Sequence, residues 1–167
     1  MTLYVDADAC PVKDEVYRVA ARSKLRVYVV SNARMRLPDD PWVEAVIVAA
    51  GPNVADDWIA ERAGKGAVVV TADVPLADRC VKAGARVVSP TGRVFDGASI
   101  GMALATRDLM EDLRSAGAIT GGPRPFAPKD RQAFLQSLDR EIRRAARDLA
   151  GPARGFHPLV KTTTAST

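Results

Sequence analysis

The sequence contains very few of the residues on which most nucleophilic and zinc-dependent enzymes rely. It has a single histidine, His157, and two cysteines, Cys10 and Cys80, in 167 residues. Two cysteines do not make a disulfide framework, and their positions match neither a CxxC motif nor a zinc-ligand spacing. One histidine leaves almost no material for a Ser-His or Cys-His catalytic pair. Any catalysis must therefore depend mainly on carboxylates.

Long apolar runs and aromatic residues are also scarce. No apolar run approaches the roughly 20 residues that a membrane span needs. The start, MTLYVDADAC, lacks the basic-then-apolar layout of a signal peptide. We therefore expect a cytoplasmic protein with no membrane partner. Only nine residues are aromatic, so stacking of bases on aromatic side chains is not expected to be the main mode of any nucleic-acid binding.

The composition is that of one folded domain with an uneven distribution of charge. Hydrophobic residues make up 47% of the chain and charged residues 26%, which is ordinary for a globular protein. The formal net charge is +4, but residues 1–100 hold 13 basic and 13 acidic side chains. The positive excess thus belongs to the last third. A basic end opposite an acidic edge would suit a polyanion lying across both.

Through the first 90 residues, short β-branched runs alternate with helical patterns. This alternation predicts an α/β fold in which helices cover both faces of a parallel sheet. The expected strands are Leu3–Asp6, Leu25–Ser31, Ala45–Ala49, Ala67–Thr71 and Arg86–Ser89. The expected helices are Val12–Arg22, Val54–Arg62 and Pro75–Lys82, and Asn32–Pro41 is expected to be a loop.

Beyond Gly97 the pattern is helical only. Ser99–Ser115 carries apolar residues at helical intervals, and a Gly- and Pro-rich connector, 121–126, leads to a helix from about Lys129 to Leu149. We expect residues 1–97 to form the core, 98–150 a helical extension packed on it, and 151–167 a disordered tail. Arginines of the last helix, Arg143 and Arg144 among them, form either a solvated face or a binding surface for nucleic acid.

Polar residues cluster where the predicted strands end. Asp6 and Asp8 close the first strand, Ser31 and Asn32 close the second, and Thr71 and Asp73 close the fourth. Asp78 follows five residues later, and Asp56 and Asp57 open the helix before the fourth strand. Because the carboxyl ends of parallel strands share one edge, we expect these groups to converge there.

The electrostatic repulsion within such a cluster of acidic side chains must be offset. Carboxylates 4–5 Å apart repel one another by about 3–4 kcal/mol per pair at an effective dielectric near 20. Protonation with raised pKa values, or a divalent cation, would relieve this repulsion. Oxygen ligands without histidine or thiolate suit Mg²⁺ or Mn²⁺ rather than structural zinc.

Each acid also has a purely structural interpretation. Asp73 lies where a helix N-cap is expected, and Asp56 and Asp57 are favoured by the dipole of a helix start. The pair Asp6 and Asp8 gains little from capping, so it favours a functional site. Cys10, at a strand-to-helix junction, and Cys80 are expected to be buried thiols.

Five ordered motifs resemble the bacterial YaiI/YqxD family over about residues 1–142. They are Asp6-Ala-Asp8-Ala-Cys10-Pro11-Val12-Lys13, Ser31-Asn32, Ala55-Asp56-x-x-Ile59, Val70-Thr71-Ala72-Asp73-Val74-Pro75-Leu76-Ala77 and Gly121-Gly122-Pro123-x-Pro125-Phe126. The pattern is also similar to that of the PIN-like nuclease superfamily, which implies a PIN-like sandwich. That similarity implies metal-binding acids at Asp6, Asp56 and Asp73, with Asp8 as an addition that some relatives share and Asp78 as a further acid. Asp57 is expected to point elsewhere.

Three functions are compatible with these residues. The first is a Mg²⁺- or Mn²⁺-dependent nuclease acting on RNA more readily than on DNA, with Asp6, Asp8, Asp56, Asp73 and Asp78 in catalysis and Ser31, Asn32, Thr71, Arg143 and Arg144 contacting the substrate. The second is a phosphatase similar to the haloacid dehalogenases, in which Asp6 would be the nucleophile. The third is a non-catalytic RNA-binding module. A homo-oligomer is compatible with each.

Overall fold

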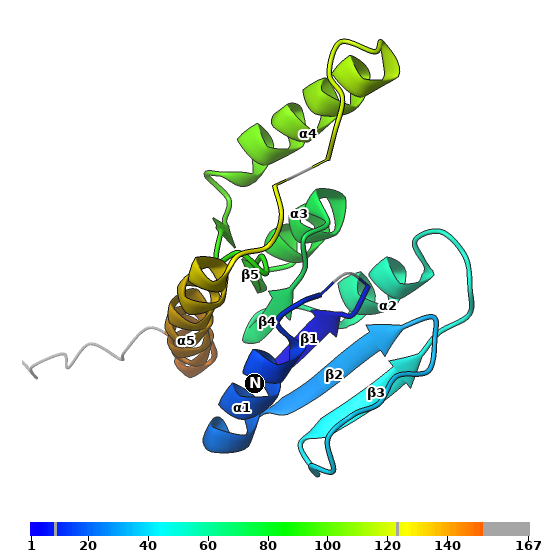
Figure 1. The fold of residues 1–167 in the computed structure, drawn as a ribbon. Coiled ribbons are helices and arrows are strands. Elements are labelled where there is room, and N and C mark those ends of the chain that lie inside the picture. Colours follow the sequence, from blue (N-terminus) through cyan, green and yellow to red (C-terminus); the bar gives the residue numbers. More distant parts are fainter. Residues whose placement is uncertain (9, 123, 152–167) are drawn as a thin grey trace, which may run out of the picture.

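The chain is an α/β sandwich in which a six-stranded sheet lies between two layers of helices (Figure 1). A computed structural model describes residues 1–8, 10–122 and 124–151. The strands are β1 Thr2–Asp6, β2 Arg26–Ser31, β3 Val43–Ile47, β4 Ala67–Val70, β5 Arg86–Val88 and β6 Val94–Phe95. The helices are α1 Lys13–Ser23, α2 Val54–Arg62, α3 Val74–Lys82, α4 Ile100–Ser115 and α5 Pro128–Ala150. The predicted α/β class is confirmed and is consistent with a PIN-like fold. His157 and the expected tail, apart from Gly151, lie outside the described residues.

The strand order is β3-β2-β1-β4-β5-β6, and all neighbouring pairs are parallel except β5 and β6. On one side of β1 lie β2 and then β3, the next strands in the chain. On the other side of β1 lie β4 and then β5, which follow later in the chain. The order therefore reverses between β1 and β4. Ligands of open α/β sheets bind at such a point, beyond the carboxyl ends of the strands.

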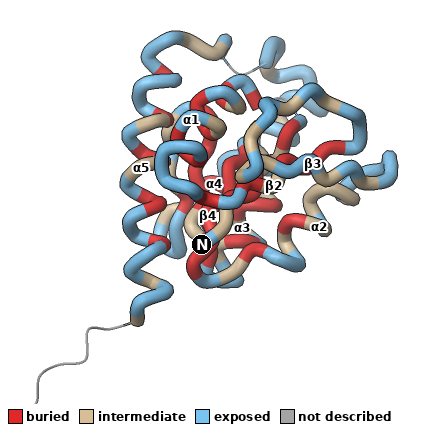
Figure 2. The backbone as a smooth tube through the Cα atoms, turned by 90° about the horizontal axis from the view of Figure 1, so that it is seen from below, coloured by how far each residue is buried: buried red, intermediate tan, exposed pale blue. Residues whose placement is uncertain are grey.

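Alternate side chains of the central strands enter two separate cores. Leu3 and Val5 of β1 pack with α1 and α5 on one face, whereas Tyr4 packs with α2, α3 and the start of α4 on the other. This alternation explains why the strands are almost entirely apolar. Buried residues follow the strands and the inward sides of the helices (Figure 2).

Two features of the sheet differ from the prediction. The third strand begins at Val43 rather than Ala45, because Asp40 closes a turn on the amide of Trp42 and pairing with β2 starts directly afterwards. This strand lies at the edge of the sheet, and most of its residues are exposed or half-buried, so it is not covered on both faces. The two-residue strand β6 was not predicted, because it is too short to show a periodic pattern.

The last helix completes the core from the opposite end of the chain. Phe134 and Leu138 are fully buried in the same cluster as Leu3 and Val5. By contrast, α4 buries only Ile100 and Ala103. None of the helices in the described ranges combines the length and apolar character needed to cross a bilayer.

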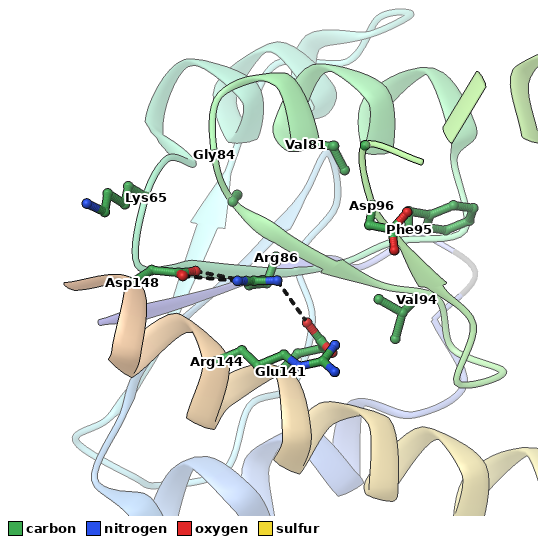
Figure 3. A pocket seen from close by; sticks show the side chains of 12 residues that line it. Lys65, Val81, Gly84, Arg86, Val94, Phe95, Asp96, Glu141, Arg144 and Asp148 are labelled. Atoms are coloured by element: carbon green, nitrogen blue, oxygen red, sulfur yellow. Dashed lines mark hydrogen bonds and ion pairs between the residues drawn. The ribbon is translucent and has the colours of Figure 1, made fainter. Parts of the chain in front are cut away.

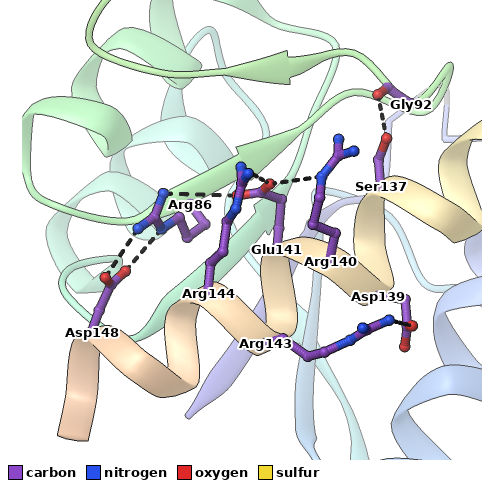
Figure 4. Close-up of polar contacts among 9 residues, drawn as sticks. All are labelled: Arg86, Gly92, Ser137, Asp139, Arg140, Glu141, Arg143, Arg144 and Asp148. Atoms are coloured by element: carbon purple, nitrogen blue, oxygen red, sulfur yellow. Dashed lines mark hydrogen bonds and ion pairs between the residues drawn. The ribbon is translucent and has the colours of Figure 1, made fainter. Parts of the chain in front are cut away.

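Polar contacts fix α5 against β5 and the turn that follows it (Figure 4). Arg86 donates to both carboxylate oxygens of Asp148, at 2.8 and 3.0 Å, and Ser137 Oγ donates to the carbonyl of Gly92 at 2.6 Å. Glu141 is fully buried, and Arg144 donates to its Oε1 at 2.8 Å. A buried carboxylate needs such a partner, and Arg86 of β5 lies 3.9 Å from its other oxygen. The contacts of Arg86 and Gly92 with α5 hold the helix in one register.

The contact at Gly92 predicts that replacing this residue separates α5 from the sheet. Gly92 has φ +87°, and a Cβ there would lie 2.6 Å from the carbonyl carbon of Ala133 on α5. Gly92→Ala should therefore lower the free energy of unfolding by about 2–4 kcal/mol, from backbone strain and overpacking together. Gly97→Ala is the matched control, because its Cβ would meet nothing within 4 Å. Urea denaturation measures both, and equal stability of the two variants would contradict the packing described.

Candidate active site

An acidic cleft of about 410 Å³ lies at the carboxyl ends of β1 and β4, where the strand order reverses. Four aspartates contribute to its walls, and no lysine or arginine among the described residues does. The lining residues are Asp6, Asp8, Asn32, Gly51, Pro52, Asn53, Ala55, Asp56, Ala72 and Asp73. Three separate stretches of chain thus bring their carboxylates to one hollow, as the sequence predicted for Asp6, Asp8, Asp56 and Asp73.

A chain of hydrogen bonds connects the two central strands at the base of the cleft. Thr71, which follows β4, donates from Oγ1 to Oδ2 of Asp6 at 2.9 Å, and Thr71 Oγ1 also accepts the amide hydrogen of Asp73 at 3.0 Å. Asp73 Oδ1 in turn accepts the amide hydrogen of Leu76 at 2.8 Å and caps α3. Asp73 is therefore a helix cap and a wall of the cleft at once, so the two interpretations of this residue do not exclude each other.

The cleft raises the pKa of two of its carboxyl groups. Burial raises the pKa of Asp6 from 3.8 to about 6; the Thr71 hydrogen bond opposes the shift, and the charges of Asp56, Asp8 and Asp73 add to it. Burial and the charge of Asp73 also raise the pKa of Asp56. Two groups whose pKa values are raised by burial and by neighbouring carboxylates are typical of a functional site.

The oxygen ligands of the cleft fit a hard divalent cation, but the carboxylates do not lie close enough together to surround it completely. All four charged groups are carboxylates, which Mg²⁺ and Mn²⁺ prefer. Within the described part of the chain, no three acidic, histidine or cysteine groups lie close enough together to hold a metal ion. Magnesium commonly keeps several waters and uses only one or two protein carboxylates. The arrangement thus fits a partly hydrated ion held by some of Asp6, Asp8, Asp56 and Asp73.

Several residues expected at the site lie apart from the cleft walls. Asp78 on α3 forms an ion pair with Lys82 at 2.8 Å, and the buried Ser31 accepts the amide hydrogen of Ala33. Asp57 pairs with Arg79 at 2.6 Å and is not among the residues that line the cleft.

The two arginines expected to contact the substrate lie on α5. Arg143 forms an ion pair with Asp139, and Arg144 forms one with Glu141, so each is engaged by a carboxylate of its own helix (Figure 4). The structure therefore does not bring these two residues together with the acidic cleft.

One wall of the cleft was not predicted from the sequence. Gly51, Pro52 and Asn53 lie between β3 and α2 and line the cleft beside Asp56. Asn53 has the left-handed φ of +63°, which turns the chain into the helix. The Gly-Pro-Asn cluster is a recognisable turn signal, but a turn signal does not indicate which cavity the turn borders.

A second cavity, of about 340 Å³, lies where α5 faces β5 and β6 (Figure 3). Its walls carry three basic and three acidic residues, and its two arginines are bonded to acids of the same cavity: Arg86 to Asp148 and Arg144 to Glu141. These charges neutralise one another and hold α5 in place. The acidic cleft, with charge of one sign, is therefore the candidate active site.

Both cysteines are buried, as predicted. Burial raises the pKa of the Cys10 thiol and raises that of Cys80 to about 12. Since a nucleophilic cysteine requires the thiolate, neither residue is activated for covalent catalysis.

The raised pKa of Asp6 predicts a specific pH dependence of stability in the presence of a chelator. The carboxyl group of Asp6 binds its proton more tightly in the folded protein, where its pKa is about 6, than in the unfolded chain, where its pKa is 3.8. The protonated group therefore stabilises the folded state in full below pH 3.8, and this stabilisation is lost as the pH rises through about 6. Asp6→Asn keeps an acceptor for Thr71 and abolishes this loss. At pH 8 we expect Asp6→Asn to be more stable than wild type by about 1–2 kcal/mol, after allowing for solvent screening. Urea unfolding from pH 4 to pH 8 tests this, with Asp57→Asn as the control; a less stable Asp6→Asn at pH 8 would contradict it.

Comparison with known proteins places the chain in one family. A family profile described as "Uncharacterized BCR, YaiI/YqxD family" matches residues 4–144. A UPF0178 protein of Azorhizobium caulinodans is 63% identical over 147 residues, which cover 88% of this chain and 92% of the relative. A UPF0178 protein of Rhodopseudomonas palustris (strain BisB18) is 62% identical over 145 residues, which cover 87% and 94%. No solved structure matches the chain. The match over most of the sequence, together with these relatives, shows that the chain belongs to the YaiI/YqxD family.

Proposed function

We propose that this protein is a divalent-cation-dependent phosphodiesterase that cleaves nucleic acid, with RNA as the preferred substrate. The observation that carries the proposal is the convergence of Asp6, Asp8, Asp56 and Asp73 on one cleft, where burial first and the neighbouring carboxylates second raise the pKa values of Asp6 and Asp56. Bound Mg²⁺ or Mn²⁺ would polarise the phosphate and offset charge on the leaving oxygen. This chemistry needs neither histidine nor thiolate.

The residues of the cleft have distinct roles in this proposal. Thr71 occupies Oδ2 of Asp6 and so fixes the orientation of that carboxyl group, which leaves Oδ1 to face the substrate. In this proposal Asp6 would hold the cation through its other oxygen, and its own charge would be offset by the ion. Asn32, which also lines the cleft, offers an amide that can donate to a phosphate oxygen.

Basic side chains beside the cleft favour a phosphate-bearing substrate. Lys13 donates to the carbonyl of Ala7 at 3.5 Å, between Asp6 and Asp8 in the chain, and the exposed Arg34 follows Asn32 by two residues. Neither Lys13 nor Arg34 forms an ion pair within the described residues. In this proposal Lys13, bonded to the loop that carries Asp6 and Asp8, and Arg34, two residues after Asn32, would hold the flanking phosphates of a polynucleotide.

Cation binding is the first prediction of this proposal. Mg²⁺ or Mn²⁺ should raise the melting temperature of the wild-type protein, because a ligand at a hundred times its Kd stabilises the folded state by about 2.7 kcal/mol. Asp6→Asn and Asp73→Asn should lose most of this increase, while Asp57→Asn should retain it. Differential scanning fluorimetry with chelator, Mg²⁺ and Mn²⁺ measures the effect. An equal increase in wild type and Asp6→Asn would place the cation elsewhere.

The second prediction concerns cleavage. Mixed single-stranded RNA should be hydrolysed only when a divalent cation is present, and Asp6→Asn should reduce the rate at least a hundredfold, or by about 2.7 kcal/mol of transition-state stabilisation. Asp57→Asn should cleave at close to the wild-type rate. Cleavage that persists in chelator, or that Asp6→Asn leaves unchanged, would refute the assignment. Trapping of a phosphoryl group on Asp6 would instead favour the phosphatase alternative.

A further inference from the structure

Helix α4 leaves most of its length exposed. It spans Ile100–Ser115 and buries only Ile100 and Ala103, both in its first turn, where it packs on α3. The remaining three turns extend away from the body of the molecule (Figure 1). Residues 105–112 are all exposed. The apolar pattern that predicted this helix is therefore left without a partner in the single chain.

One side of α4 carries a mainly apolar row, in which Thr106 is the polar member and Leu113 is half-buried. With 3.6 residues per turn, Met102, Thr106, Leu109 and Leu113 follow one another along one side of the helix. Met102 is 72% exposed and Leu109 57%. Among the described residues, three of the six exposed large hydrophobic residues lie on this helix, with Met110 as the third. Single exposed hydrophobic residues are ordinary, but several that gather on one helix mark an interaction surface.

The outer turns of α4 have little to stabilise them in isolation. Helices shorter than about 12–15 residues are marginal in water, and most helix stability in proteins comes from packing of an apolar face. Here no residue of α4 beyond Ala103 is fully buried, and only Leu104 and Leu113 are half-buried. A partner that covers the row formed by Met102, Thr106, Leu109 and Leu113 would supply the missing packing.

Charges beside the row indicate which partner fits. Asp112 lies along one edge of the row and Arg114 along the other, and neither forms an ion pair within residues 1–8, 10–122 and 124–151. If two copies of α4 run parallel about a two-fold axis, the acidic edge of each meets the basic edge of the other. Antiparallel pairing would instead place the two Asp112 edges together. The helix is therefore complementary to a second, parallel copy of itself.

We propose that α4 is a homodimerisation helix that pairs in parallel with α4 of a second copy of this chain. The row Met102, Thr106, Leu109 and Leu113 forms the seam, and two symmetric ion pairs between Asp112 and Arg114 of the other copy fix the direction. Pairing of identical patches about a two-fold axis is the commonest way in which soluble proteins form oligomers. This inference is independent of the acidic cleft and of the proposed nuclease activity.

Sedimentation velocity over a dilution series tests the seam. The wild-type protein should be a dimer that dissociates on dilution, and Leu109→Glu should raise the dimer Kd at least tenfold. Leu149→Glu is the matched control, because Leu149 is a similarly exposed leucine, at 53%, on α5; it should dimerise like wild type. Circular dichroism establishes that each variant is folded. A wild-type chain that stays monomeric throughout, including one that binds lipid vesicles instead, overturns the proposal.

A charge exchange tests the direction of pairing. Asp112→Arg and Arg114→Asp should each weaken the dimer, because each places like charges against one another. The double variant Asp112→Arg/Arg114→Asp should recover the wild-type Kd, since it restores opposite charges with the edges exchanged. If the double variant is as weak as the single variants, parallel pairing through these residues is wrong.

Discussion

The half-buried carboxyl group of Asp6, at the end of the central strand, is the constraint around which the site is arranged. The register of β1 with β2 and β4 fixes Asp6 beside Thr71 and Asp73, and the helix start of α2 adds Asp56. Bringing these acids together works against folding, because burial and repulsion both disfavour their charged forms. The structure relieves this only in part, through one hydrogen bond from Thr71 and a raised pKa. An arrangement that disfavours folding in this way is typical of sites retained for function.

The rigidity of that site depends on chain segments far away in the sequence. One face of the sheet is covered by α1 and the C-terminal helix α5, whose Phe134 and Leu138 pack in the same cluster as Leu3 and Val5 of β1. The tie between Arg86 and Asp148 and the bond from Ser137 to Gly92 hold α5 in position. The helical extension is thus part of the core that supports β1, while α4 adds a separate exposed surface.

The sequence predicted those features that depend on local patterns. β-branched runs located β1, β2, β4 and β5, and parallel strand ends explained why Asp6, Asp8, Asp56 and Asp73 line one cleft. Features that depend on tertiary contacts could not be predicted from local sequence patterns. Spacing alone did not show that Asp78 pairs with Lys82, that Gly51, Pro52 and Asn53 complete the cleft, or that the apolar side of α4 faces solvent. Periodicity shows that a helix has an apolar side, but not what covers it.

The most direct test of the account is the position of a bound cation. Crystals soaked in Mn²⁺, with diffraction recorded at the manganese absorption edge, reveal the ion by its anomalous signal. The account predicts a peak inside the cleft, within ligand distance of oxygens from Asp6, Asp8, Asp56 or Asp73, and the loss of that peak in Asp6→Asn. A well-ordered cleft without a peak at saturating Mn²⁺, or a peak held only by residues outside the cleft, would contradict the central claim.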